Sequence, residues 1–138
     1  MNKVILYNVL DNDPKFETDI QNDLKDLIGF QDYRIIAGKG ENGKFTLFAF
    51  LYNWEVTPLT KIFKKYGMLL DYKDITDDVI TGKLPNDYYK ESFEFVTYRK
   101  ILNEFIEINT TTDHILDMIS ESGIESLTQF QKNILKNH

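Results

Sequence analysis

The chain has 138 residues, 42% hydrophobic and 14% aromatic, which is typical of one ordinary domain and excludes a disordered chain. It contains no cysteine, which excludes disulfides, thiolate metal sites and cysteine nucleophiles. Its 22 acidic and 16 basic residues give a net charge of −6, which disfavours binding to duplex nucleic acid unless the basic side chains cluster on one surface.

The first predicted elements are a strand and a helix. An aliphatic run predicts a buried strand over residues 4–10, and it has no small-residue cleavage site of a signal peptide. Asp13 then suits a helix N-cap and Pro14 the first helical position, where the missing N–H is not needed. Apolar residues at helical spacing continue this helix until Gly29 ends it.

A hairpin and a second helix–strand pair follow. Strands are expected over 33–37 and 44–52, joined by a glycine-rich loop. A helix beginning at Thr57-Pro58 ends at Gly67, and a short strand is expected over 68–72. The order strand, helix, strand, strand, helix, strand predicts an α+β fold with a ferredoxin-like βαββαβ body at residues 1–74.

A mainly helical cover is expected over residues 75–109, completing a single α+β domain at 1–109. Thr76 is a candidate cap for a short helical turn, and residues 85–89 are expected to form a loop. Helical spacing of apolar residues predicts a helix over 92–108, although its first half, 93–98, also fits a strand.

A helical hairpin is predicted as the tail over residues 112–138. Thr112 is expected to cap its first helix, and Thr128 with Gln131 has the pattern of a capping box for the second. The tail resembles the short C-terminal helical hairpin of many bacterial proteins, including some rhomboid proteases, in Ile115-Leu116-Asp117, Ile119, Gly123-Ile124, Ser126-Leu127-Thr128 and Leu135. An acid usually stands in that hairpin where this chain has Gln131. The resemblance implies a small packing or docking element rather than an activity, and it does not extend to residues 1–109.

The glycine pattern Gly38-x-Gly40-x-x-Gly43 matches a dinucleotide-binding fingerprint. That chemistry requires the glycines to lie between a strand and a helix, so that the helix N-terminus meets the pyrophosphate. Here a strand is predicted to follow, so the pattern favours a hairpin loop and no cofactor is expected.

Single-stranded nucleic acid, RNA in particular, is one alternative partner. RNA-recognition folds share the predicted element order and stack bases on aromatic side chains of the sheet. If one sheet face is open, we expect aromatic stacking residues and a lysine ridge to form the site, comprising Tyr7, Phe48, Phe50, Lys61, Lys64 and Lys65.

Residues that carry chemistry are few, which favours a non-catalytic role. His114 and His138 neighbour no nucleophile or orienting acid in the sequence, and an enzyme of unrecognised type remains an alternative. The acids between residues 71 and 94 lack the ligand spacing and glycine of a calcium loop, so no metal site is predicted.

The same acidic segment predicts a protein-binding surface. We expect a protein-binding or regulatory module in the cytoplasm, with no membrane span. An inhibitor, immunity or anti-defence protein fits its size and acidity. The predicted contact residues are acids with aromatic anchors, namely Asp74, Asp77, Asp78, Tyr88, Tyr89 and Glu91.

Overall fold

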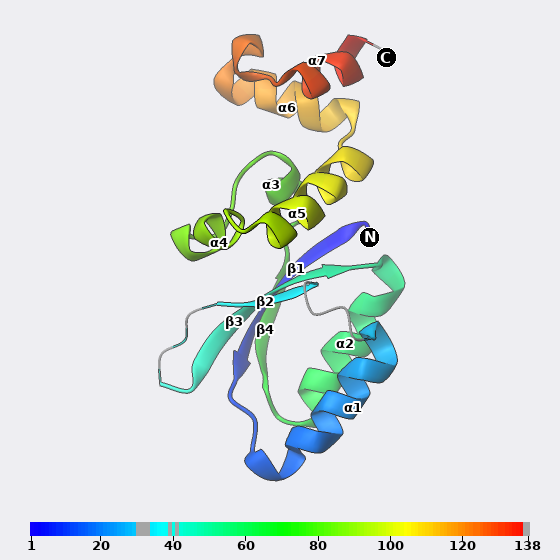
Figure 1. Ribbon diagram of the computed structural model, residues 1–138, viewed down its shortest axis with the longest axis vertical. Helices are drawn as coiled ribbons and strands as arrows, with labels where there is room; N and C mark the ends of the chain where they lie inside the picture. The colour runs from blue at the N-terminus through cyan, green and yellow to red at the C-terminus, as the bar shows by residue number, and fades with distance from the viewer. Residues whose placement is uncertain (30–33, 39, 41, 137–138) are drawn as a thin grey trace.

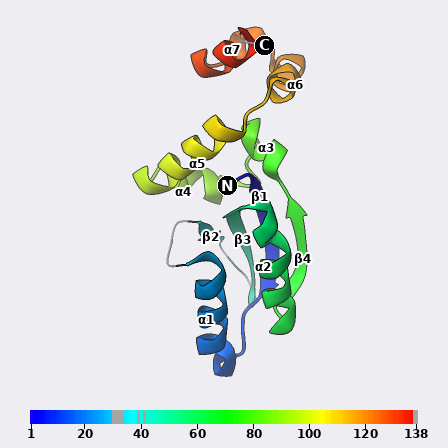
Figure 2. The same cartoon turned by 90° about the vertical axis from the view of Figure 1, so that its right-hand side faces the viewer.

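The computed structural model describes residues 1–29, 34–38, 40 and 42–136 of the chain. At its centre lies a four-stranded sheet in the order β2-β3-β1-β4, in which every neighbouring pair is antiparallel. Its strands are β1 (Lys3–Leu10), β2 (Ile35–Ala37), β3 (Lys44–Leu51) and β4 (Leu69–Asp74). Helices pack on both faces, so the fold is α+β as predicted (Figures 1 and 2).

Two helices cover one face of the sheet. They are α1 (Glu17–Ile28), which follows the 3₁₀ turn η1 (Pro14–Phe16), and α2 (Asn53–Lys65). Asp13 accepts a backbone hydrogen bond at the start of η1, and Gly29 follows α1 with a φ of +72° that suits glycine. Alternate strand residues and the apolar stripes of both helices form the core here, including Ile5, Tyr7, Val9, Ile20, Ala49, Leu51, Leu59 and Phe63.

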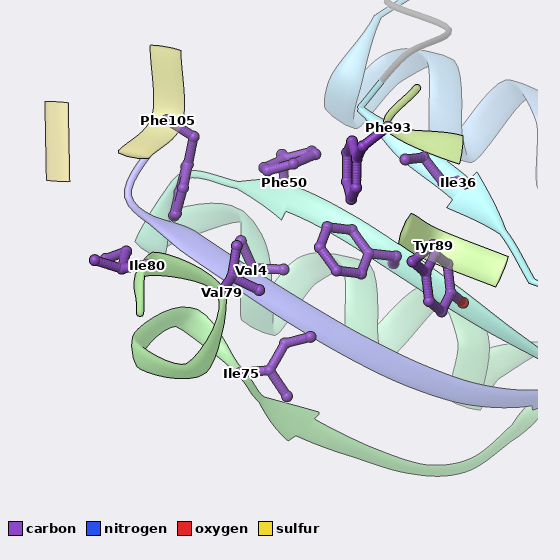
Figure 3. Packing of buried hydrophobic residues seen from close by; sticks show 10 residues of the cluster. Val4, Ile36, Phe50, Ile75, Val79, Ile80, Tyr89, Phe93 and Phe105 are labelled. Carbon is purple, nitrogen blue, oxygen red and sulfur yellow. The ribbon is translucent and has the colours of Figure 1, made fainter. Parts of the chain in front are cut away.

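The opposite face is covered by three helices from the second half of the chain. They are α3 (Thr76–Ile80), α4 (Asp87–Ser92) and α5 (Val96–Asn109). The buried cluster beneath them contains Val4, Ile36, Phe48, Phe50, Ile75, Val79, Ile80, Tyr89, Phe93 and Phe105 (Figure 3). The described residues therefore bury both faces of the sheet.

The tail extends beyond α5 at one end of the molecule (Figure 1). It consists of α6 (Thr112–Ser122), the 3₁₀ turn η2 (Ile124–Ser126) and α7 (Gln129–Lys136). The Thr128 N–H donates to Gln131 Oε1 at 2.8 Å and the Gln131 N–H donates to Thr128 Oγ1 at 3.2 Å, so the predicted capping box is confirmed. None of the described helices has the length and apolar character needed to cross a membrane.

Helix α2 begins five residues earlier than predicted, with its N-cap at Tyr52 instead of Thr57. Glu55 Oε1 accepts the Tyr52 N–H at 2.7 Å, which satisfies a free donor at the helix start. Pro58 therefore lies inside the helix and does not mark its first turn.

The cover also departs from its predicted boundaries. The loop expected over 85–89 is wrong, because α4 begins at Asp87 and Asn86 Oδ1 accepts the Tyr89 N–H at 3.3 Å. Residues 93–95 form a turn before α5 starts at Val96, so 93–98 is not a strand.

Smaller differences concern strand ends and caps. Tyr33, the predicted start of the second strand, lies outside the described residues, and β4 extends to Asp74 instead of ending at residue 72. Thr76 is the first residue of α3, not its cap, and Thr111 replaces Thr112 as the cap of α6.

Candidate functional site

The sheet face beneath α4 and α5 is closed to solvent. Phe48 and Phe50 are both fully buried. The Phe48 ring centroid lies 5.1 Å from that of Tyr89 and 5.5 Å from that of Phe93, while Phe50 lies 5.4 Å from Phe105 (Figure 3). The expectation that Phe48 and Phe50 line an open face is wrong, because the helical cover buries both rings.

Tyr7 lies on the opposite face of the sheet from Phe48. It pairs with Leu47 in the antiparallel register, which places it under α2. Its hydroxyl and the Thr60 hydroxyl share a hydrogen bond of 3.0 Å, and its ring meets the Phe63 ring edge-on at 5.1 Å. Burial raises the pKa of Tyr7, and the bond to Thr60 offsets part of this rise. Tyr7 is thus a core residue that cannot stack a base here.

The predicted lysine ridge on α2 is exposed, but an acid of α1 compensates part of its charge. Lys61, Lys64 and Lys65 are exposed, and Lys65 Nζ lies 3.2 Å from Asp23 Oδ2. The Tyr66 hydroxyl donates to the same carboxylate at 2.7 Å. The hydrogen bonds from Tyr66 and then Lys65 lower the pKa of Asp23, which keeps this neutralising charge in place.

Tyr89 is buried, contrary to its predicted role as an exposed anchor. It is fully inaccessible, because α4 turns it towards β3, where its hydroxyl and Thr46 Oγ1 share a hydrogen bond of 2.7 Å. Burial raises its pKa, opposed by the bond to Thr46. Its role is to attach the helical cover to the sheet.

The glycine pattern between β2 and β3 has a packing explanation. A Cβ atom at Gly38 would collide with Thr46 Oγ1 and the Tyr89 hydroxyl. Asn42 and Gly43 have φ values of +54° and +72°, as a tight turn requires. Because β3 follows the glycines, the strand-to-helix context of a dinucleotide site is missing. Residues 39 and 41 of the pattern lie outside the described residues.

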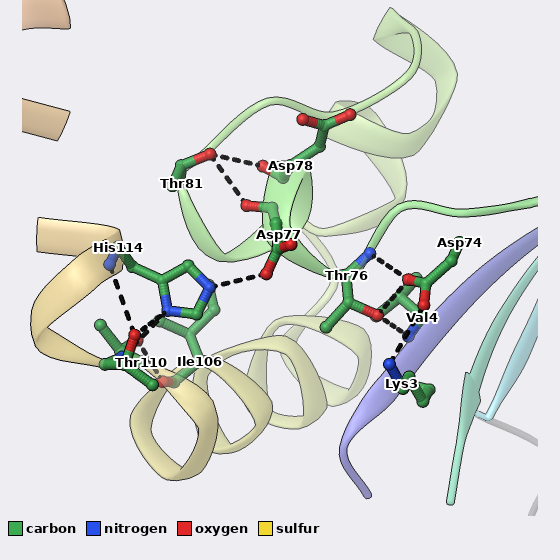
Figure 4. A network of polar contacts seen from close by, with 11 residues as sticks. Lys3, Val4, Asp74, Thr76, Asp77, Asp78, Thr81, Ile106, Thr110 and His114 are labelled. Atoms are coloured by element: carbon green, nitrogen blue, oxygen red, sulfur yellow. Dashed lines mark hydrogen bonds and ion pairs between the residues drawn. The ribbon is translucent and has the colours of Figure 1, made fainter. Parts of the chain in front are cut away.

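The first acids of the predicted contact surface are engaged within the chain (Figure 4). Asp74 accepts the Thr76 N–H at 2.9 Å and hydroxyl at 2.6 Å, and lies 3.2 Å from Lys3 Nζ. Burial opposes its ionisation, but the bonds from Thr76 and Lys3 outweigh burial and lower its pKa. Asp77 Oδ1 lies 2.8 Å from His114 Nε2, and the side chains of both Asp77 and Asp78 are exposed.

His114 joins the tail to the cover. Its Nδ1 accepts the Thr111 N–H at 3.0 Å, so its Nε2–H is placed to donate to Asp77 (Figure 4). Lys83 and Glu121 form a second link of 2.8 Å between the same parts. Among the described residues, no three His, Asp or Glu side chains meet in an arrangement that could hold a metal ion. His138 lies outside the described residues.

The junction of α4 and α5 exposes the predicted anchor Tyr88 together with two apolar side chains that sequence reasoning missed, Phe95 and Val96. Phe95 and Val96 are 68% and 70% exposed, and Tyr88 is 40% exposed. Periodicity places Phe95 on the buried stripe of a helix over 92–108. In the structure it is instead the extended N-cap of α5, with φ −69° and ψ 133°. No sequence signal separates it from the buried Phe93 two residues earlier.

Three carboxylates precede Phe95 and Val96 in the sequence, and Arg99 and Lys100 follow them. We define the α4–α5 junction surface by its exposed members, which are Asp87, Tyr88, Glu91, Glu94, Phe95 and Val96. Of the predicted protein-binding residues, Tyr88 and Glu91 belong to it. Two further exposed rings lie at the start of α2, where Tyr52 and Trp54 stack with centroids 6.4 Å apart.

Comparisons of this chain with protein-family models, with curated proteins and with solved structures found no match.

Proposed function

We propose that the chain is a non-catalytic protein-binding module that docks a basic protein surface through the α4–α5 junction surface. The observation that carries this proposal is the exposure of adjacent Phe95 and Val96, directly after the carboxylates Glu91 and Glu94. An exposed apolar side chain contributes favourable binding free energy when a partner removes it from water. Aromatic anchors of this type dominate the binding energy of protein interfaces.

Charge at the junction supports a basic partner. Residues 87–94, which precede Phe95, carry three acids, Asp87, Glu91 and Glu94, against the single base Lys90, a formal charge of −2, and the bases Arg99 and Lys100 follow on α5. Complementary charge around an apolar anchor accelerates encounter and excludes partners of the wrong sign. The surface therefore fits a partner with an apolar pocket rimmed by Lys or Arg.

The proposal also keeps the more specific predictions made from the sequence, which concern the fold of the body, the cellular setting and the class of regulatory protein. The strand order β2-β3-β1-β4 with antiparallel neighbours supports a ferredoxin-like description of the body. A cytoplasmic setting is also part of this proposal, since the N-terminal aliphatic run fits a core strand better than a signal peptide. An inhibitor, immunity or anti-defence protein would use such a surface, and the hairpin α6–α7 would serve as a docking element.

The test is affinity capture from the native cell with the whole chain as bait. We expect one stoichiometric partner, which is then purified and titrated against the chain by calorimetry. Phe95→Asp and the pair Glu91→Lys with Glu94→Lys are each expected to weaken the affinity at least tenfold. Added salt should weaken the wild-type affinity, because the carboxylates contribute.

Trp54→Ala is the matched control, since it removes an exposed aromatic ring from a different part of the surface. It is expected to leave the partner's affinity unchanged. Recovery of no partner, or a partner whose affinity is insensitive to Phe95→Asp, would contradict the proposal.

A further inference from the structure

Strand β4 has one unpaired edge. It is the last strand of the sheet, and no strand of the described residues pairs with its outer side (Figure 2). All of its residues except Leu69 are exposed, with Leu70 at 47% and Tyr72 at 49%. Such an edge offers free N–H and C=O groups to another strand.

The register identifies which backbone groups point outward. The Ile75 N–H donates to Val4 O at 2.9 Å, so these residues occupy a hydrogen-bonded position of the ladder, although the Val4 N–H donates to Thr76 Oγ1 instead. Such pairs alternate along the strand, so Lys73 and Asp71 direct their backbone groups to β1. Tyr72 and Asp74 therefore present their N–H and C=O groups to solvent.

The β4 sequence is complementary to itself in an antiparallel arrangement. When Tyr72 lies opposite its symmetry mate, the outward-facing groups of both copies form one hydrogen-bonded pair. The register then places Asp71 opposite Lys73 of the second copy, and Lys73 opposite Asp71. Opposite charges and aromatic residues facing each other across two strands both stabilise pairing.

We propose that two copies of this chain associate edge to edge through β4, continuing the sheet across a two-fold axis at Tyr72. The interface is isologous, as a two-fold dimer requires. It is short, because the β1–β4 register shifts between Asn8 and Val9 and this irregularity limits the regular edge to residues 71–74. The dimer is therefore weak and should form only at high protein concentration.

This inference goes beyond the proposed function and is independent of it. The outer edge of β4 and the helices α4 and α5 lie on opposite sides of the molecule in Figure 2. The dimer therefore leaves the α4–α5 junction surface open.

The test is sedimentation velocity of the full chain over a series of protein concentrations. Wild type is expected to shift from monomer to dimer as concentration rises. Asp71→Lys places Lys opposite Lys, and Lys73→Asp places Asp opposite Asp, so each substitution alone should abolish dimer formation. The double exchange Asp71→Lys with Lys73→Asp restores both pairs in the reverse sense and should restore the dimer.

Two further variants separate the interface from effects within one copy. Asn8→Ala removes the hydrogen bond that Asn8 Nδ2 donates to Asp71 Oδ1, and should leave association unchanged. Tyr72→Pro removes an outward N–H without breaking the β1–β4 ladder, and should abolish the dimer. Wild type that remains monomeric throughout, or a folded double-exchange variant that does not dimerise, would overturn the proposal.

Discussion

Arg34, which precedes β2, and Glu55, in the first turn of α2, form a buried bidentate ion pair. Arg34 Nη1 donates to Glu55 Oε2 at 3.1 Å, Nη2 donates to Oε1, and the two side chains are only 6% and 2% exposed. Arg34 Nε also donates to Phe50 O at 3.2 Å. The pair links the entry to β2 with β3 and with the N-terminus of α2.

Arg34→Met should lower the free energy of unfolding by about 3–5 kcal/mol, because it leaves the Glu55 carboxylate buried without its counter-ion. Urea denaturation measures this loss. Lys83→Met is the matched control, since it breaks the exposed ion pair with Glu121 and should cost less than about 1 kcal/mol. Equal losses in the two variants would show that the buried pair contributes no more than a surface pair.

Gly38→Ala should destabilise the chain by about 1–3 kcal/mol, because the new Cβ atom meets Thr46 Oγ1 and the Tyr89 hydroxyl. Removing that hydroxyl with Tyr89→Phe should relieve part of the clash. We therefore expect the double variant to be less destabilised than the sum of the single changes, as a double-mutant cycle by urea denaturation would measure. Strict additivity would show that Gly38 and Tyr89 do not interact.

The order of the body elements was predictable because its signals are local. Gly29 and Gly67 end their helices with φ values of +72° and +68°, a conformation that glycine adopts without steric cost. Because side chains alternate along a strand, Phe48 and Leu47 lie on opposite faces of the sheet. Each of these signals is contained in a few neighbouring residues.

The candidate site was less predictable because its features depend on distant contacts. Thr46 and Tyr89 are 43 residues apart, and the buried Tyr89, unlike the exposed Tyr88, contacts β3 through its hydroxyl and its ring. The exposure of Phe95 depends on where α5 begins, which periodicity alone placed too early. Likewise Thr57-Pro58 resembles a helix start, but the capping contact from Glu55 moves that start to Asn53.

Stability should fall as the pH rises above about 10, in part because Tyr7 and Tyr89 ionise less readily in the folded chain. Burial raises both pKa values above the unfolded value of 10.0. The stabilisation is therefore complete below that pH and is lost as the pH rises through the folded-state values. Urea denaturation at increasing pH should show a flatter profile for Tyr7→Phe combined with Tyr89→Phe. A profile identical to wild type would contradict this assignment.

Phe48→Ala should cost about 3–5 kcal/mol of folding free energy, because it empties the centre of the aromatic cluster beneath the helical cover. Urea denaturation measures the loss, and Phe95→Ala is the matched control. Phe95→Ala truncates a ring that is 68% exposed and should change stability by less than about 0.5 kcal/mol.

Partner binding should respond in the opposite way, so that Phe95→Ala weakens the affinity for the partner more than Phe48→Ala does. Phe95 contacts the partner in our proposal, whereas Phe48 is inaccessible to any ligand while its cover is in place. A stable Phe48→Ala variant that loses binding to single-stranded RNA would instead show that the cover opens and that the aromatic sheet face is the working surface.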